Sequence, residues 1–169
     1  MSDSLNICLP CGLCCNGTLI GFVELNQEEI PVLNKLMDIE VSDENGIFIQ
    51  PCDNYSDCNG CGIYSQRPKQ CDSYKCELLK SVENKETSFN SAIEVIDIIK
   101  EQKIIIEKQL AIEKIELKSP SFYFKMVELK KILNKQNSEL SITQNQYELL
   151  SNLNQLDNLI STKMGLSFN

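Results

Sequence analysis

Apolar residues recur at helical spacing through the second half of the chain, in three stretches that open with helix-capping signals. The first stretch opens at a capping box, Ser91–Glu94, and runs to about Leu117. The second opens at Ser119–Pro120, because proline is favoured at the first helical position, and runs to residues 134–136. We therefore predict two consecutive helices here.

The third stretch opens at another capping box, Ser141–Gln144, and should end near Gly165, a residue type favoured just after a helix. Its apolar residues alternate four and three positions apart: Leu149, Leu153, Leu156 and Ile160. This spacing is typical of a helix that packs on another helix, in a bundle core or in an oligomer. The second half is thus predicted to be a helical region of about three helices.

The first half has a shorter and more mixed pattern. Gly17–Leu25 is rich in β-branched and apolar side chains, which favours a strand, whereas Gln27–Ile39 has apolar residues at helical spacing after an Asn26–Glu29 cap. Asn45–Gly46 marks a turn before a second strand at Ile47–Ile49. We predict an α+β protein: a small module with short strands and one helix, followed by the helical region.

The distribution of charge changes along the chain together with the apolar pattern. Residues 1–86 carry 14 acidic and 6 basic side chains, a net of −8, whereas residues 87–169 carry 10 of each. We expect two domains, a cysteine-cluster module over 1–86 and a helical extension over 87–169. An acidic module is poorly suited to a phosphate backbone, so binding of nucleic acid is not expected.

Nine cysteines, all between Cys8 and Cys76, determine the chemistry expected of the first module. The N-terminus lacks the basic and apolar segments of a secretory signal, and no apolar stretch is long enough for a membrane span, so we expect a cytoplasmic protein. In that reducing compartment dense cysteines mark metal ligands or reactive thiols more often than disulfides. Because the chain has no histidine, the metal site must be built mainly from sulfur, with carboxylate as the remaining option.

The cysteines form two clusters. The first is a CxxCxxCC arrangement: Cys8, Cys11, Cys14 and Cys15. The second is more widely spaced: Cys52, Cys58, Cys61, Cys71 and Cys76. Two residues between sulfurs let the chain turn tightly enough for both thiolates to reach one metal, a spacing that zinc knuckles and four-iron clusters share. These sulfurs suffice for two tetrahedral sites, for a four-iron cluster plus one zinc, or for one centre with spare thiols.

A compound motif combines the first cluster, in which Gly12 follows Cys11, with Cys52 and a segment that runs from Cys61 through Tyr64, Arg67, Pro68, Cys71 and Tyr74 to Cys76. This motif resembles the YkgJ-like CxxCxxCC family, a zinc- or iron-chelating domain, over roughly residues 8–80. The resemblance implies eight ligands: Cys8, Cys11, Cys14, Cys15, Cys52, Cys61, Cys71 and Cys76. Cys58 is additional to the family pattern. It is either a substitute ligand or a free thiol outside the metal site. Asp72 stands where the family often has a basic residue.

Arg67 is the single arginine of the chain and lies inside this pattern. Its guanidinium could bind the cofactor region by donating hydrogen bonds to metal-bound sulfurs, or could hold a carboxylate. The alternative is a brace that ties the Cys61 and Cys71 segments together through backbone carbonyls.

Both zinc and iron suit a thiolate site. Zinc held by four thiolates would fold a small module with little core. A CxxCxxC triplet followed by distant cysteines is, however, a layout shared with bacterial ferredoxins. The pattern therefore favours an iron–sulfur cluster, of the 4Fe-4S type, over zinc, and both stay open.

The sequence contains no glycine-rich nucleotide loop, histidine or evident acid–base pair, so an enzyme is not favoured. We predict a structural or accessory metal-binding protein whose helical half contacts a protein partner or a second copy, with no membrane contact. The first alternative is a redox or protein-modification component, since similar cysteine clusters occur in flagellin lysine methylases. The second is a metal buffer or sensor, suggested by Cys58.

Overall fold

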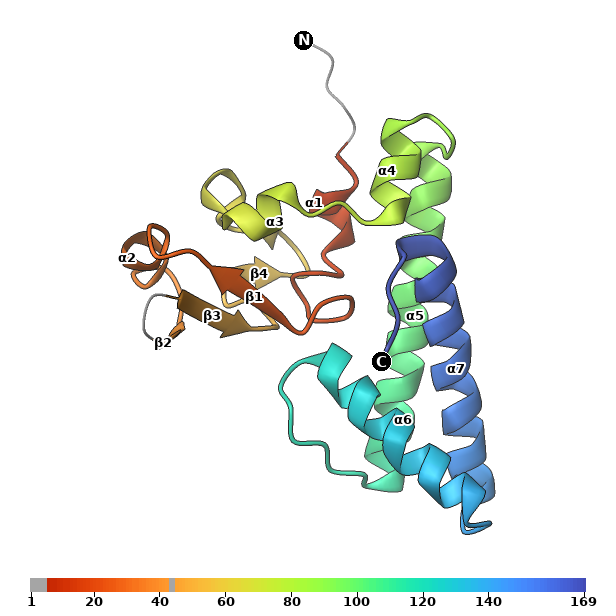
Figure 1. Ribbon diagram of the computed structural model, residues 1–169. Coiled ribbons are helices and arrows are strands. Elements are labelled where there is room, and N and C mark those ends of the chain that lie inside the picture. The colour runs from red at the N-terminus through yellow and green to blue at the C-terminus, as the bar shows by residue number, and fades with distance from the viewer. Residues whose placement is uncertain (1–5, 43–44) are drawn as a thin grey trace. The chain divides into compact units, whose positions relative to one another are not determined.

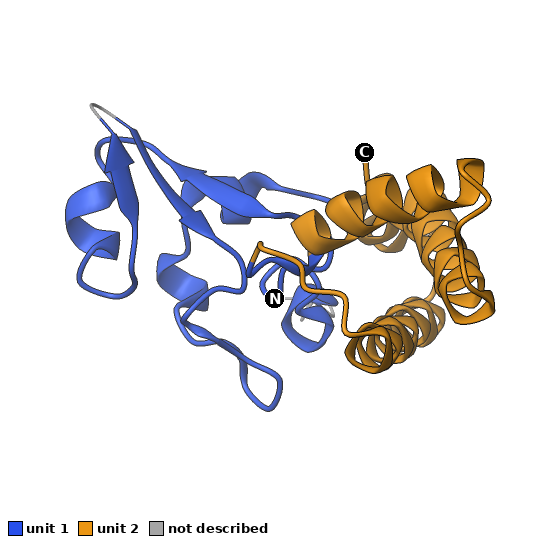
Figure 2. Ribbon diagram, turned by 90° about the horizontal axis from the view of Figure 1, so that it is seen from below, with its two compact units in different colours: residues 1–75, 120–122 blue, residues 76–119, 123–169 orange. Residues whose placement is uncertain are grey.

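The computed structural model describes residues 6–42 and 45–169 (Figure 1). Contacts divide the chain into two compact units: a first unit up to Lys75 that also includes Pro120–Phe122, and a second unit of residues 76–119 and 123–169 (Figure 2). The predicted α+β class is confirmed, with short antiparallel strands in the first unit and long helices in the second. Within the described ranges, no helix combines the length and apolar character needed to cross a membrane.

The first unit contains a sheet of three antiparallel strands in the order β1-β3-β2: β1 (Phe22–Leu25), β2 (Glu40–Ser42) and β3 (Asn45–Ile49). Val23 pairs with Phe48, and alternate side chains of the two strands point to one buried face. That face forms a small core: Val23, Leu25, Leu33, Met37 and Phe48. A separate hairpin pairs β4 (Tyr55–Ser56) with β5 (Gly60–Cys61).

Among the described residues up to Lys75, helical structure is limited to short turns: α1 (Cys8–Cys11), α2 (Ile30–Leu33), α3 (Lys69–Ser73) and the 3-10 turn η1 (Tyr64–Gln66). The helix predicted over Gln27–Ile39 is therefore reduced to α2. After α2 the chain continues in turns, where Asn54 donates to the Leu36 carbonyl at 2.9 Å and Asp53 accepts from the Asp38 N–H at 3.1 Å.

Two further expectations for the first unit need correction. The strand predicted over Gly17–Leu25 is confined to β1, because the N–H groups of Thr18 and Leu19 both donate to the Leu13 carbonyl and fold this segment into a turn. The turn predicted at Asn45–Gly46 is also wrong, since both residues pair with β2 as the start of β3.

The second unit contains four helices: α4 (Glu77–Glu83), α5 (Phe89–Glu113), α6 (Phe122–Ser138, whose first residue belongs to the first unit) and α7 (Gln144–Met164). The predicted apolar stripe of α7 is confirmed as core: Leu149, Leu153, Leu156 and Ile160 are at most 1 % exposed. The contact division falls at Lys75 rather than at residue 86, because α4 packs on α5 and α7.

The ends of the long helices differ from the predicted ends by a few residues. α5 begins after Ser88, whose hydroxyl accepts the Ser91 N–H at 3.1 Å, and it ends before Lys114, which adopts a left-handed conformation. α7 begins after Thr143 rather than Ser141. The predicted end of α7 at Gly165 is confirmed, where the glycine has a φ of 75° and forms the C-cap.

Candidate metal centre

The first cysteine cluster begins with α1, a single helical turn that begins at Cys8 and ends at Cys11. The turn ends at Gly12, which has a φ of 66° and donates its N–H to the Cys8 carbonyl. Glycine adopts this left-handed conformation without the steric cost that a Cβ brings. The chain therefore reverses directly after Cys11 and leads on to Cys14 and Cys15.

Tyr55 lies against this reversal. A Cβ at Gly12 would overlap the hydroxyl and ring of Tyr55, so the tyrosine packs directly on the glycine backbone. The Tyr55 hydroxyl donates to Asp57 at 2.9 Å. Burial raises the pKa of Tyr55, as do the Asp57 carboxylate and the nearby Cys15 and Cys11 thiolates. The tyrosine is thus within electrostatic reach of the first cluster.

The second cluster meets the first at two points. The Cys52 N–H donates to the Cys15 carbonyl at 2.9 Å, which joins the two cysteine segments through their backbones. The β4–β5 hairpin, which contains Cys61, contacts α1 closely, because a Cβ at Gly60 would lie 2.9 Å from the Leu9 carbonyl oxygen. These contacts bring Cys52 and Cys61 beside the CxxCxxCC segment.

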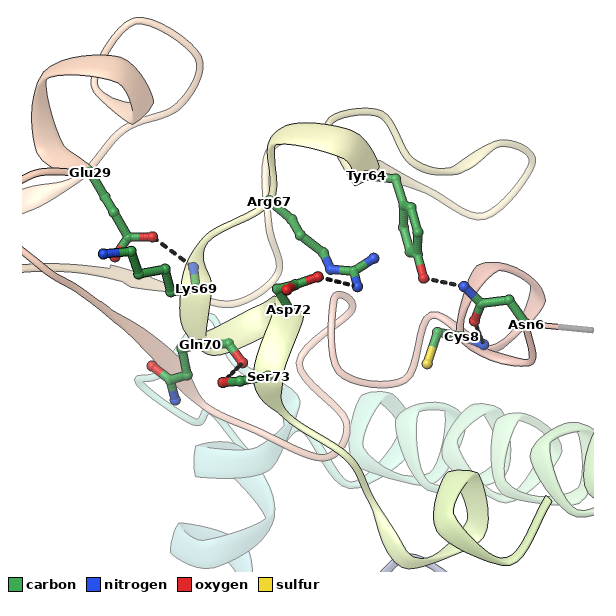
Figure 3. Close-up of polar contacts among 9 residues, drawn as sticks. All are labelled: Asn6, Cys8, Glu29, Tyr64, Arg67, Lys69, Gln70, Asp72 and Ser73. Carbon is green, nitrogen blue, oxygen red and sulfur yellow. Dashed lines mark hydrogen bonds and ion pairs between the residues drawn. The ribbon is translucent and has the colours of Figure 1, made fainter. Parts of the chain in front are cut away.

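Cys71 is carried by α3, which packs on β1. Glu29 accepts the Lys69 N–H at 2.6 Å at the start of α3, and Gln70 accepts the Glu24 N–H of β1 at 2.6 Å (Figure 3 shows these side chains). These bonds hold α3 on the sheet. Cys71 consequently packs against the apolar core of the first unit, as Cys52 does.

Electrostatic coupling identifies the thiols that share one environment. Burial raises the pKa of Cys15 to about 12, and four neighbouring cysteines act in the same direction: Cys61, Cys52, Cys71 and Cys11. A thiolate next to other thiolates in a partly desolvated site is unfavourable, so Cys15 resists losing its proton unless a cation joins the site. We refer to Cys11, Cys15, Cys52, Cys61 and Cys71 as the coupled thiols.

Two more of these thiols show the same effect. Burial raises the pKa of Cys71 to about 12, with Cys52 and Cys61 contributing, whereas the charge of Arg67 acts in the opposite direction. Burial also raises the pKa of Cys52, although the Asn54 N–H donates to this thiol and partly offsets the increase. The local backbone therefore already provides a donor to a sulfur that would carry negative charge when bound to a metal.

The other predicted ligands lie in different settings. Cys8 is exposed on α1, where its N–H donates to Asn6 at 2.9 Å, and Cys14 is half-buried beside the coupled Cys15. Cys58 is exposed in the β4–β5 hairpin loop. Cys76 belongs to the second unit, where it caps α4 and its sulfur accepts the Leu79 N–H at 3.4 Å. Burial raises the pKa of Cys76, and the N–H groups at the start of α4 lower it in part.

All nine cysteines lie within the described residues and are present as thiols rather than disulfides. Within residues 6–42 and 45–169, no three cysteine, aspartate or glutamate side chains converge closely enough to hold a single metal ion. The coupled thiols therefore share one electrostatic environment without meeting at a single-ion position. A donor set of several thiols fits zinc or an iron–sulfur cluster and suits hard, oxygen-seeking cations poorly.

Arg67 bridges the segments on either side of it. Its guanidinium lies 3.9 Å from the centre of the Tyr64 ring and donates to Asp72 at 2.5 Å (Figure 3). Tyr64 in turn accepts a hydrogen bond from Asn6, two residues before Cys8. Asp72, the departure from the family pattern, is thus the ion-pair partner of Arg67. The Arg67 Nε is buried and has no hydrogen-bond partner among the described residues.

Two residues of this region were not anticipated from the sequence. Tyr55 packs on Gly12, and Glu29 holds the start of α3 while its charge raises the pKa of Cys71. Tyr55 is distant from Gly12 in sequence and carries no spacing signal. Glu29 was predicted only as part of a helix cap, and its carboxylate indeed accepts the Asn26 N–H at 2.9 Å.

Comparison with known protein families gives a match that includes the cysteine clusters. Residues 7–113, more than half of the chain, match the CxxCxxCC family model, described as a putative zinc- or iron-chelating domain. The match includes every cysteine and extends through α5. Neither the curated proteins nor the solved structures contain a match to the chain.

Proposed function

The chain belongs to the CxxCxxCC family, and from this premise we propose that its first unit binds an iron–sulfur cluster through the coupled thiols, with zinc as the alternative metal. The proposed role is structural or accessory, in the cytoplasm, where a reducing environment keeps the thiols available. Cys8, Cys14 and Cys76 remain candidate ligands from the family pattern.

The observation that carries this proposal is that cysteines of α1, the Cys52 segment, β5 and α3 all lie within electrostatic reach of Cys15, to whose backbone the Cys52 N–H is bonded. Thiols that are buried together bind protons tightly, and a soft cation is the natural replacement for those protons. The bound group would supply positive charge and covalent links between α1, the Cys52 segment, β5 and α3. That linkage would stabilise a unit whose own apolar core is small.

The spacing of the cysteines along the chain supports an iron–sulfur cluster over a single zinc. A CxxCxxC triplet followed by distant cysteines is a layout shared with bacterial ferredoxins.

Anaerobic purification followed by iron, zinc and sulfide analysis and a visible spectrum tests the metal. We expect a brown protein that contains iron and acid-labile sulfide. A colourless protein that contains stoichiometric zinc would replace the iron–sulfur assignment with the zinc alternative. A protein that lacks both metals and keeps its fold in the presence of chelators would contradict metal binding altogether.

Cysteine variants test the ligand assignment. We expect Cys15→Ser and Cys71→Ser to lose most of the bound metal, because each removes a half-buried member of the coupled thiols. Cys58→Ser is the matched control, since it makes the same chemical change at an exposed position of the hairpin loop, and it should retain its metal. Equal metal loss in all three variants would show that the coupled thiols are not a distinct ligand set.

A further inference from the structure

Helix α5 has apolar side chains on two sides. The side that packs in the second unit, where α5 runs along α7 (Figure 1), contains residues that are at most 1 % exposed: Ala92, Ile96, Ile99 and Ile106. The other side contains three isoleucines spaced seven residues apart, which are exposed by 47 %, 41 % and 71 %: Ile98, Ile105 and Ile112. We call these three residues the outer stripe.

A seven-residue repeat keeps the outer stripe on one side of the helix, because seven residues make nearly two turns. Single exposed apolar residues are common on proteins, whereas an aligned series of them marks an interaction surface. A helix that is apolar on two sides is normally covered on both.

The charges that flank the outer stripe indicate what covers it. Glu101 and Lys108 are both exposed and lie on the same flank of the stripe. When two copies of α5 pack antiparallel with Ile105 on the twofold axis, residues equally far before and after Ile105 meet. Ile98 then contacts Ile112 of the second copy, and Glu101 comes within one residue of Lys108 of the second copy, twice per dimer.

A parallel arrangement lacks this complementarity, because each stripe residue then lies level with its own equivalent and Glu101 lies level with Glu101. The self-complementary charges thus select a second copy of this chain, in the antiparallel direction. We propose that the outer stripe of α5 is the interface of an antiparallel homodimer, formed by the second unit independently of the metal.

Measurement of the mass of the full chain in solution, by light scattering and sedimentation equilibrium, tests this proposal. We expect a mass of twice 19.2 kDa that dissociates on dilution. Ile105→Glu places two like charges on the twofold axis and should leave only monomer. Leu140→Glu, at a position exposed by 92 % outside the stripe, is the matched control and should remain dimeric.

A charge-exchange cycle tests the direction of packing without altering the apolar stripe. Glu101→Lys and Lys108→Glu should each raise the dimer dissociation constant about tenfold, because each turns both cross-pairs into like charges. The double variant should restore the original value. Circular dichroism shows whether Ile105→Glu folds. If it does not, the two charge substitutions, which lie at exposed positions, still test the dimer interface. A wild-type protein that is monomeric at all concentrations would overturn the proposal. A dimer whose dissociation constant is unchanged by Ile105→Glu and by both charge exchanges would overturn it as well.

Discussion

At the scale of single residues, Gly12 sets the path of the chain through the first cysteine cluster. It reverses the chain after Cys11 in a left-handed conformation, and its missing side chain is the space in which the Tyr55 ring lies. Both conditions exclude a Cβ, one through the backbone and one through packing. The fit of Tyr55 on Gly12 therefore holds the CxxCxxCC segment against the β4–β5 hairpin.

We expect Gly12→Ala to destabilise the metal-bound first unit by about 2–4 kcal/mol, because left-handed strain and overlap with Tyr55 add to each other. Metal retention during dialysis against a chelator measures this effect. Leu9→Ala, a change at an exposed position of the same turn, should leave metal retention unchanged. Wild-type retention by Gly12→Ala would show that the segment repacks freely.

Asp157 is the buried charged residue of the second unit, 9 % exposed. It accepts hydrogen bonds from Lys130 at 2.5 Å, from the Phe168 N–H at 2.8 Å and from Ser167 at 3.1 Å. Burial alone would raise the pKa of this carboxyl, but the bonds from Lys130, Phe168 and Ser167 and the charge of Lys130 outweigh it, so the pKa is lowered. The carboxylate thereby ties the C-terminal segment to α6 and α7.

A lowered pKa in the folded state means that Asp157 stabilises the protein fully above the unfolded pKa of about 3.9, and that this stabilisation is lost as the pH falls further. Asp157→Asn should therefore lower the free energy of unfolding by about 1.5–3 kcal/mol at pH 7. Below pH ~4 the free energy of unfolding should fall less steeply with pH in this variant than in the wild type. Urea unfolding at several pH values measures both effects. Glu139→Gln, an exposed carboxyl-to-amide control, should behave like the wild type.

At the scale of elements, the start of α7 shows what a sequence pattern can and cannot specify. Two overlapping segments fit the capping-box pattern, Ser141–Gln144 and Thr143–Gln146, and the helix uses the second. Thr143 accepts the Gln146 N–H at 3.2 Å, and the Gln146 side chain accepts the Thr143 N–H at 3.2 Å. Ser141 instead donates to the Gln136 carbonyl at the end of α6, so it is engaged by the preceding helix.

Thr143→Ala should destabilise the second unit by about 1 kcal/mol, the usual cost of losing an N-cap side chain. Ser141→Ala removes a hydroxyl only two positions away and should cost clearly less. Thermal unfolding followed at the helical circular dichroism signal compares the two variants. A larger loss in Ser141→Ala would place the functional cap at the position that the sequence first suggested.

Patterns that repeat within one element were predictable, and features made by distant segments were not. The buried stripe of α7 and its end at Gly165 followed from periodicity and from glycine at the helix end. The segment after α2 is bonded by Asn54 and Asp53, and Gly12 is covered by Tyr55. For the candidate centre, the spacing of the cysteines predicts them as metal ligands. The coupled thiols could be recognised only from the packing of distant segments.

At the scale of the whole molecule, the two units differ in what holds them together. The first has a core cluster of Val23, Leu25, Leu33, Met37 and Phe48 beside its cysteines. The second buries apolar residues from all of its helices. Leu13 and Leu19 are also buried in the first unit, but its elements are short strands and turns. Additional links would stabilise such a unit, and structural metal sites can contribute about 10–16 kcal/mol of apparent free energy.

Metal removal should therefore affect the units unequally. We expect a strong chelator under reducing conditions to unfold the first unit while the helices of the second persist, because all of the coupled thiols lie in the first unit. Hydrogen exchange resolved by peptide measures this, with loss of protection in β1–β3 and retained protection in α5 and α7. Simultaneous loss of protection in both units would show that they fold as one.

The short segment Pro120–Phe122 limits how the first unit can be separated from the rest of the chain. It belongs to the first unit although the chain on both sides of it belongs to the second, and the fully buried Ser121 donates to the Gly17 carbonyl at 3.5 Å. The cysteine-rich unit is thus encoded in two pieces that enclose α4 and α5. Residues 1–75 alone therefore do not make up the whole unit, and a fusion protein designed to contain it would also need residues 120–122.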